Sequence, residues 1–208
     1  MGNLPTVNIG RDVFWQPSGV DPSVRHRCAR QRGLTAWLTG LPGSGKSTVA
    51  AGAEVALLGR GHLAMRLDGD NLRHGLNDGL AFSAADRAEA VRRAGEAALL
   101  LAESGVIALV SLVSPYRVDR EAVRRRHRAC GVPFVEVHVD CPLAVAEARD
   151  PKGLYARARA GELRGFTGVD DPYEPPTAPE IRLATDVDGT ETCVDSLVES
   201  ILAVARRD

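Results

Sequence analysis

The chain has 208 residues, of which 44% are hydrophobic and 25% charged, and this composition excludes wholesale disorder. A net charge of −1 excludes a sequence-independent nucleic-acid binder, because such proteins are normally basic. No apolar run reaches the ~18 residues of a membrane span, and the first residues lack the pattern of a signal peptide. We therefore expect a cytoplasmic protein with neither a nucleic-acid nor a membrane partner.

The length predicts one domain with a small appendage, at roughly 150 residues per domain. Residues 1–33 are polar, contain scattered Pro and Gly, and hold Trp15. We expect them to form a lead-in that packs back on a single domain at 34–208.

Strands and helices are predicted to alternate through this domain. The strands are placed at 35–39, 63–67, 106–110, 133–139 and 181–185, and the helices at 46–59, 84–104, 117–130 and 190–206. Such alternation predicts a parallel α/β sheet with helices on both faces, whose ligands bind beyond the carboxyl ends of the strands. The stretch 150–180 is too long for a simple connection and is predicted to be a lid or substrate loop.

Cysteine and lysine usage narrows the chemistry. The four cysteines and five histidines do not cluster, which argues against a zinc site and favours reduced thiols. Only Lys46 and Lys152 are lysines among 26 basic residues. A lysine retained in an arginine-rich chain indicates a place where a compact ammonium is needed. The arginines of 124–128 carry no such argument and are interpreted as a solvated helix face.

A phosphate-binding loop follows the first predicted strand and opens the first predicted helix. The segment 40–48 matches G-x-x-x-x-G-K-[ST] with Gly40, Gly43, Ser44, Gly45, Lys46, Ser47 and Thr48. Glycines let backbone N–H groups surround a phosphate, and the helix N-terminus adds a partial positive charge. We expect Lys46 to reach the β- and γ-phosphates of ATP and Ser47 to hold Mg²⁺. The fold class is thus a P-loop NTPase fold with a lid loop.

Two carboxylates follow the second predicted strand, at the same edge of the sheet. Asp68 and Asp70 are candidates to position an acceptor hydroxyl as base and to orient water around Mg²⁺. The alternative is that Asp70 is only a helix N-cap. Arg73 lies one helical turn after Asp70 and is a candidate anion clamp.

Two further segments carry candidate ligand contacts. Arg87 lies in the first turns of the long helix, where a cation opposes the helix dipole and so suggests an anionic partner. The alternative is a solvated helix face. Phe166 lies in a Gly-rich loop and is a candidate stacking surface for a base, the alternative being a loop anchor in the core.

Taken together, these segments resemble the adenylylsulfate kinase (APS kinase) family from about Trp15 to Ile181. The motifs that carry the resemblance are G-L-x-G-S-G-K-S-T, D-G-D-N-L-R-H-G-L, F-S-x-x-D-R, S-P-Y-R-x-D-R, V-D-C-P-L, R-D-P-K-G-L-Y, A-R-A-G-E-L-R-G-F-T-G and P-Y-E-x-P. The resemblance implies transfer of the γ-phosphate of ATP to the 3′-hydroxyl of adenosine 5′-phosphosulfate in sulfate activation. It also implies a homodimer, which members of the family often form.

The resemblance further implies roles for individual side chains. Asp70 would lie near the 3′-hydroxyl and Mg²⁺, while Arg73 and Arg87 would bind the phosphosulfate. Phe82 and Phe166 would sandwich the acceptor adenine.

Two more residues match the family's motifs. Lys152 would serve a mobile lid. Ser114, in S-P-Y-R, matches a serine that is phosphorylated in some members and is taken as a catalytic candidate.

Three positions depart from the family pattern, all on the acceptor side. An asparagine of D-R-x-E-N is replaced by Ala90, and D-L-G-F-S reads G-L-A-F-S, with Gly79 and Ala81. These departures leave open a kinase of the same architecture that acts on the ribose hydroxyl of another 5′-modified nucleotide. A third hypothesis is a nucleotide-binding subunit without turnover, against which the intact Lys46 and Asp70 argue.

Overall fold

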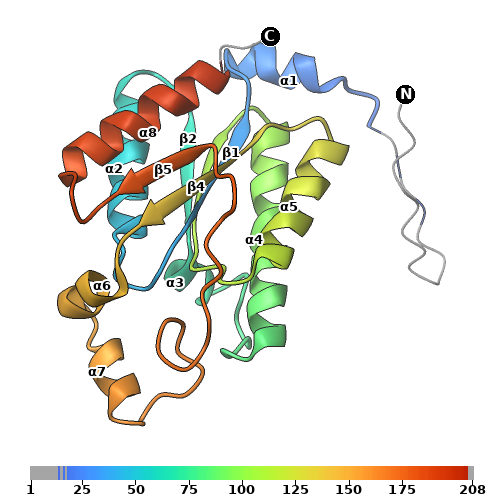
Figure 1. Ribbon diagram of the computed structural model, residues 1–208. Coiled ribbons are helices and arrows are strands. Elements are labelled where there is room, and N and C mark those ends of the chain that lie inside the picture. Colours follow the sequence, from blue (N-terminus) through green and yellow to red (C-terminus); the bar gives the residue numbers. More distant parts are fainter. Residues whose placement is uncertain (1–13, 15, 17, 206–208) are drawn as a thin grey trace.

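The computed structural model describes Phe14, Gln16 and residues 18–205 (Figure 1), so Trp15 and the start of the lead-in lie outside the described residues. The described lead-in forms a helix, α1 (Pro22–Ala29), which the sequence reasoning did not predict. Asp21 caps it by accepting a hydrogen bond from the Ser23 backbone N–H. The Gln31 side chain then donates to the carbonyls of Leu63 and Gly105, which ties the end of the lead-in to the domain.

Five parallel strands form one sheet in the order β2-β3-β1-β4-β5. Their bounds are β1 (Leu34–Thr39), β2 (Ala64–Asp68), β3 (Ile107–Ser111), β4 (Phe134–Asp140) and β5 (Ile181–Ala184). All of β1 and β3 is buried, as expected for central strands of a parallel sheet covered on both faces. The predicted parallel α/β sheet is confirmed, with strand ends within one residue of the predicted ones.

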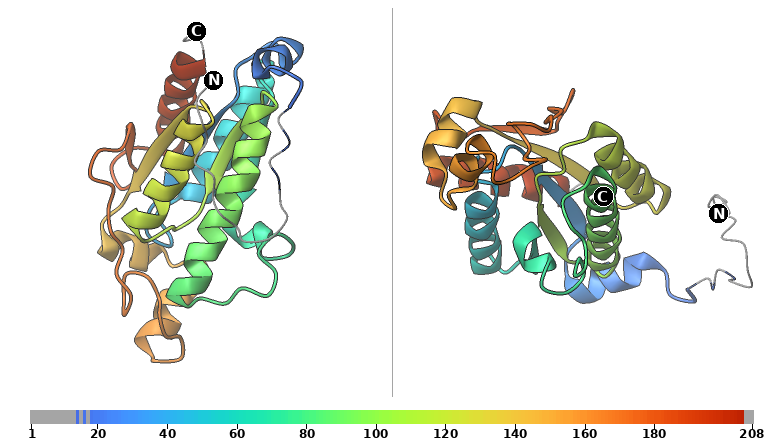
Figure 2. Two further views of the ribbon diagram at one scale, coloured as in Figure 1. Left: turned by 90° about the vertical axis from the view of Figure 1, so that its right-hand side faces the viewer. Right: turned by 90° about the horizontal axis from the view of Figure 1, so that it is seen from below.

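Four long helices cover the two faces of the sheet (Figures 1 and 2). On one face lie α2 (Lys46–Gly59) and α8 (Thr190–Ala205), and on the other lie α4 (Ala84–Glu103) and α5 (Arg117–Ala129). Each face has its own apolar core, one built on Leu34, Leu38 and Leu57 and the other on Trp37 and Val91. This three-layer arrangement leaves the carboxyl ends of the strands open.

Three short helices lie at that open end and were not predicted from the sequence. They are α3 (Gly69–Leu72), α6 (Leu143–Arg149) and α7 (Leu154–Arg159). The α7 helix lies within the predicted lid, and the carboxylate of Asp150 accepts hydrogen bonds from the backbone N–H groups of Tyr155 and Ala156 near its start. None of the described helices is both long and apolar enough to cross a membrane.

The interpretation of the arginines of 124–128 as a solvated face is wrong for two of the four. The Arg124 guanidinium pairs with Glu136 at 3.2 Å and with Glu180 at 2.5 Å, and Arg126 pairs with Glu96 at 3.1 Å. Arg125 and Arg128 are exposed. Five consecutive polar residues show no apolar periodicity, so the sequence does not reveal which of them face the sheet. Their acidic partners, on α4, on β4 and just before β5, are also distant in sequence.

Arg120, on α5, joins two loops at the open end of the sheet. Its buried guanidinium donates to Glu136 Oε1 at 2.7 Å, to the Ser114 carbonyl at 2.6 Å and to the Glu174 carbonyl at 2.7 Å. The loop after β3 and the return arm of the lid are thereby fixed to one another. All three contacts are made by one rigid fork, a geometry that lysine cannot reproduce.

We expect Arg120→Met to lower the free energy of unfolding by about 3 kcal/mol, at the lower end for a broken buried pair because Arg124 also contacts Glu136. Urea denaturation measures the change. The matched control is Arg125→Met, since Arg125 is 62% exposed and 3.8 Å from Glu121, and it should leave the unfolding midpoint unchanged. Equal midpoints for both variants would show that the Arg120 network contributes nothing.

Candidate active site

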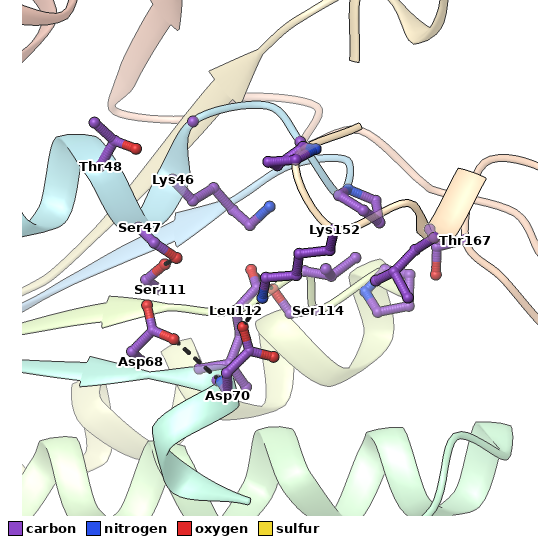
Figure 3. A pocket seen from close by; sticks show the side chains of 18 of the residues that line it. Lys46, Ser47, Thr48, Asp68, Asp70, Ser111, Leu112, Ser114, Lys152 and Thr167 are labelled. Atoms are coloured by element: carbon purple, nitrogen blue, oxygen red, sulfur yellow. Dashed lines mark hydrogen bonds and ion pairs between the residues drawn. The ribbon is translucent and has the colours of Figure 1, made fainter. Parts of the chain in front are cut away.

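A cavity of about 820 Å³ opens at the carboxyl end of the sheet. The phosphate-binding loop, the ends of β2 and β3, the start of α4 and the lid all contribute to its wall. Figure 3 shows the side chains of Lys46, Asp68, Asp70 and Lys152 gathered around it. The structure therefore brings together the residues of three sequence motifs at the place where parallel sheets bind ligands.

The loop before α2 has a backbone that requires glycine at two places. Gly45, the N-cap of α2, has φ +95°, a conformation that other residues rarely adopt. A Cβ on Gly40 would lie 2.5 Å from the Val139 carbonyl oxygen on β4. These constraints are satisfied by the motif and leave backbone N–H groups at the start of a helix, which is a site for phosphate.

Lys46 is held inside this loop. Its buried ammonium donates to the carbonyls of Gly40 at 3.0 Å and Leu41 at 2.7 Å. Burial lowers the pKa of Lys46 to about 7, and the neighbouring carboxylates of Asp68 and Asp70 only partly oppose this. The group is thus poised between its charged and neutral forms near neutral pH.

A bound phosphate should raise the pKa of Lys46, because its negative charge stabilises the ammonium. ATP binding above pH 7 should then take up a proton, and affinity should fall about fivefold from pH 7 to pH 8 as the free lysine loses its charge. Calorimetry at pH 8 in two buffers of different ionisation enthalpy measures the uptake. An ATP affinity that is flat across this range, without proton uptake, would contradict the assignment.

The donor set beside Lys46 fits Mg²⁺. The hydroxyl of Ser47 lies 3.3 Å from that of Ser111 at the end of β3, and the carboxylates of Asp68 and Asp70 lie at the end of β2 and in α3. These are hard oxygen donors, the ligands that Mg²⁺ takes. Among the described residues no three His, Cys, Asp or Glu side chains are grouped as a metal cage. The arrangement suits an ion held by one or two protein oxygens together with phosphates and water.

Asp68, not Asp70, is the N-cap of α3. The buried carboxylate of Asp68 accepts from the Asp70 backbone N–H at 3.1 Å and pairs with Arg66 at 3.0 Å. The alternative role as a helix cap therefore does not describe Asp70. The Asp70 side chain is instead 63% exposed, faces the cavity and forms an ion pair with Lys152 of the lid (Figure 3).

The residues predicted to bind the acceptor form a second group, between the end of α3 and the first turns of α4. The Arg73 guanidinium lies 4.0 Å from the centre of the Phe82 ring and donates to the Leu80 carbonyl at 3.0 Å. Arg87 donates to the Phe82 carbonyl at 2.9 Å and, across the cavity, to Thr167 Oγ1 at 2.8 Å. The interpretation of Arg87 as a solvated face is thus wrong, because the side chain connects α4 to the lid.

The two phenylalanines of the predicted sandwich differ in their surroundings. Phe82 is 55% exposed, whereas Phe166 is 8% exposed, and its ring centre lies 4.9 Å from that of Tyr155 in a T-shaped arrangement. Phe166 therefore anchors the lid in a small apolar cluster while also lining the cavity. Stacking of both rings on an adenine stays a prediction.

Ser114 is part of the cavity wall (Figure 3). Its hydroxyl is buried and accepts a hydrogen bond from Trp37 Nε1 at 3.0 Å, and its φ is +39°. A phosphorylated or catalytic Ser114 stays a prediction.

Sequence reasoning missed four side chains that shape this cavity. Ser111 meets Ser47, Arg66 pairs with Asp68, and Thr185 Oγ1 donates to the Ser44 carbonyl at 2.8 Å. The fourth, Tyr155, donates to the Pro42 carbonyl at 2.9 Å and so attaches the lid to the phosphate-binding loop. A signal existed for Tyr155, which ends R-D-P-K-G-L-Y, and for Ser111, which follows the central strand.

Comparison with known proteins agrees with this geometry. The family model described as adenylylsulphate kinase matches residues 32–184, most of the chain. This chain belongs to the adenylylsulphate kinase family. An adenylyl-sulfate kinase of Clostridium kluyveri is 46% identical over 95% of this chain and 96% of its own length. The Saccharomyces cerevisiae adenylyl-sulfate kinase is 47% identical over 94% of this chain and 96% of its own.

A solved structure of an adenylylsulphate kinase shares the fold. The Mycobacterium tuberculosis APS kinase, in complex with AMPPNP and APS, is 50% identical, with a TM-score of 0.79 over 82% of this chain and 98% of that chain. The P-loop fold expected from the sequence is confirmed, and so is the membership of the adenylylsulphate kinase family.

Proposed function

We propose that this chain transfers the γ-phosphoryl group of ATP to the 3′-hydroxyl of adenosine 5′-phosphosulfate (APS). The observation that carries this function is one cavity that holds a phosphate-binding loop with Lys46 at one end and two arginines beside an exposed phenylalanine at the other. The arrangement suits two nucleotides that meet at Asp70 between them. Membership of the adenylylsulphate kinase family supports the choice of acceptor.

Catalysis by these residues is positioning and charge stabilisation. The loop N–H groups and Lys46 bind the phosphates of ATP and stabilise charge on the transferred group. Asp70 accepts the proton of the acceptor hydroxyl as its oxygen attacks the γ-phosphorus and the bond to the β-phosphate oxygen breaks. Mg²⁺, held by Ser47 with Asp68 and Asp70 nearby, would neutralise charge on the phosphates.

A direct assay tests this function. The protein is incubated with ATP, Mg²⁺ and a panel of 5′-modified nucleotides, and ADP and the 3′-phosphorylated product are quantified. Transfer to APS above all other acceptors is the expected result, and exchange of Mg²⁺ for EDTA should abolish it. Light scattering of the same protein tests the homodimer, and cell fractionation the cytoplasmic location; both stay predictions of the sequence.

Ala90 provides a sharper test of the acceptor. The residue is buried on α4 and lines the cavity with Arg87, so the amide of the family pattern is missing at this wall. If APS is the acceptor, Ala90→Asn should lower its KM by about tenfold or more, since a hydrogen bond to a charged group contributes roughly 1.5–3 kcal/mol and each ~1.4 kcal/mol is a factor of ten. Steady-state kinetics with APS and a second 5′-modified nucleotide measures this. An Ala90→Asn variant that loses activity on the second nucleotide instead would favour a different natural acceptor.

A further inference from the structure

Asn77, on the cavity wall, has a buried side-chain oxygen without a hydrogen-bond partner among the described residues. The side chain of Asn77 is 2% exposed and lines the same cavity as Phe82 and Ala90. Its Oδ1 atom makes no hydrogen bond to any described residue. A buried carbonyl oxygen that lost its water without gaining a donor destabilises the folded protein. Such a group is expected to be retained where a ligand supplies the missing donor.

The backbone around Asn77 is fixed, so the side chain is held at this wall. The backbone N–H of Asn77 donates to the Leu72 carbonyl at 2.7 Å, and the backbone carbonyl of Asn77 accepts from the Leu80 N–H at 3.2 Å. The preceding residue, Leu76, accepts a hydrogen bond from Arg93, one helical turn after Ala90 on α4. The turn that carries Asn77 therefore packs on the helix face where the family's asparagine is replaced by alanine.

The chemistry of the oxygen restricts what it can bind. A carbonyl oxygen accepts hydrogen bonds and donates none. Phosphate and sulfate groups ionised at neutral pH bring no donor, so the partner is an N–H or O–H of the nucleoside part of a ligand. Asn77 lies in the group with Arg73 and Phe82 rather than with the phosphate-binding loop, which assigns it to the acceptor and not to ATP.

We propose that Asn77 is a specificity-determining contact whose Oδ1 accepts a hydrogen bond from the nucleoside of the acceptor nucleotide. The proposal rests on the proposed function for the identity of that nucleotide. Besides the 3′-hydroxyl, whose proton goes to Asp70 in the proposed reaction, two donors of the acceptor share this chemistry, the 6-amino group of adenine and the 2′-hydroxyl of ribose. With Ala90 offering no amide, the wall would recognise the nucleoside through Asn77.

Asn77→Leu tests the contact, because leucine is close to asparagine in size and removes the oxygen. Affinity for APS is measured by calorimetry in the presence of ADP, together with KM and kcat. We expect Asn77→Leu to weaken APS binding about tenfold or more, as a site built to hydrogen-bond its substrate does when one partner is lost. The KM for ATP should stay unchanged, which a distortion of the whole cavity would not allow, and a thermal melt checks that the variant is folded.

Two analogues identify the donor. Inosine 5′-phosphosulfate lacks the 6-amino group, and 2′-deoxyadenosine 5′-phosphosulfate lacks the ribose hydroxyl. One analogue lacks the donor that binds Asn77, and it should bind the unaltered protein weakly. Its affinity should not fall further in Asn77→Leu. The analogue that keeps this donor should lose as much affinity in Asn77→Leu as APS does. Equal losses for APS and both analogues, or an unchanged APS affinity, would overturn the proposal.

The control variant is Asp78→Asn on the same turn, whose exposed carboxylate accepts a hydrogen bond from the Gly79 N–H. It should bind all three nucleotides like the unaltered protein. Failure of the proposed function can be told apart from failure of the Asn77 contact. If only the proposed function fails, the unaltered protein binds APS without phosphorylating it. Weakened APS binding in Asn77→Leu would still support the contact in that case, and no APS binding at all would reject it.

Discussion

Lys46→Ala should reduce kcat by at least about 10²–10³-fold while the fold persists, because an electrostatic donor aimed at the transferred group is removed. The structure adds that the Lys46 ammonium also satisfies the Gly40 and Leu41 carbonyls of the phosphate-binding loop. Some loss of ATP affinity should therefore accompany the loss of turnover. Single-turnover kinetics separates the two effects, and circular dichroism with a thermal melt checks that the variant is folded.

Lys46→Arg is the informative companion. It keeps the positive charge but replaces a compact ammonium by a planar fork in a buried loop. We expect it to be nearly as inactive as Lys46→Ala. Near-normal turnover by a folded Lys46→Ala protein would overturn the mechanism.

Asp70→Asn should lower kcat by about 10²–10⁴-fold, the range for removal of a general base, with ATP binding retained. The substitution keeps the shape of the side chain but removes its charge. Its interpretation is clean because the cap of α3 is Asp68, so the helix is not disturbed. Rapid-quench measurement of phosphoryl transfer gives the rate, and equilibrium titration gives the ATP affinity.

Asp68 is the alternative base if Asp70→Asn leaves turnover unchanged. Such a result would move the base to Asp68, the carboxylate at the end of β2. Asp78→Asn, an exposed carboxylate a few residues further on, is the matched control and should leave kcat unaltered.

Much of the architecture could be predicted from the sequence. The predicted bounds of α2 are those observed, and α4 and α5 each end one residue before the predicted limit, because apolar spacing and terminal glycines mark these elements clearly. The short helices α3, α6 and α7 could not be found in this way. With four to seven residues each, they show too little periodicity, and α7 depends on a carboxylate of the lid near its start.

The candidate site, too, could be predicted only in part from the sequence. Lys46 and Ser47 could be placed because their roles follow from local backbone geometry at the start of a helix. The environment of Arg87 and Phe166 could not, since their partners Thr167 and Tyr155 lie on a loop whose path depends on the whole fold. Arg124 shows the same limit, because its acidic partners come from β4 and from the end of the lid.

The ion pair between Asp70 and Lys152 has a consequence for how ligands reach the cavity. Both side chains are more than half exposed, so water and salt screen their attraction and the pair contributes at most about 1 kcal/mol. A contact of that strength breaks and re-forms readily at ambient temperature. The phosphates of an arriving nucleotide can therefore draw Lys152 away with little opposition, and Asp70 is then left charged beside them. Lys152 thus neutralises the Asp70 carboxylate while no ligand is bound, but their ion pair opposes the entry of a ligand only weakly.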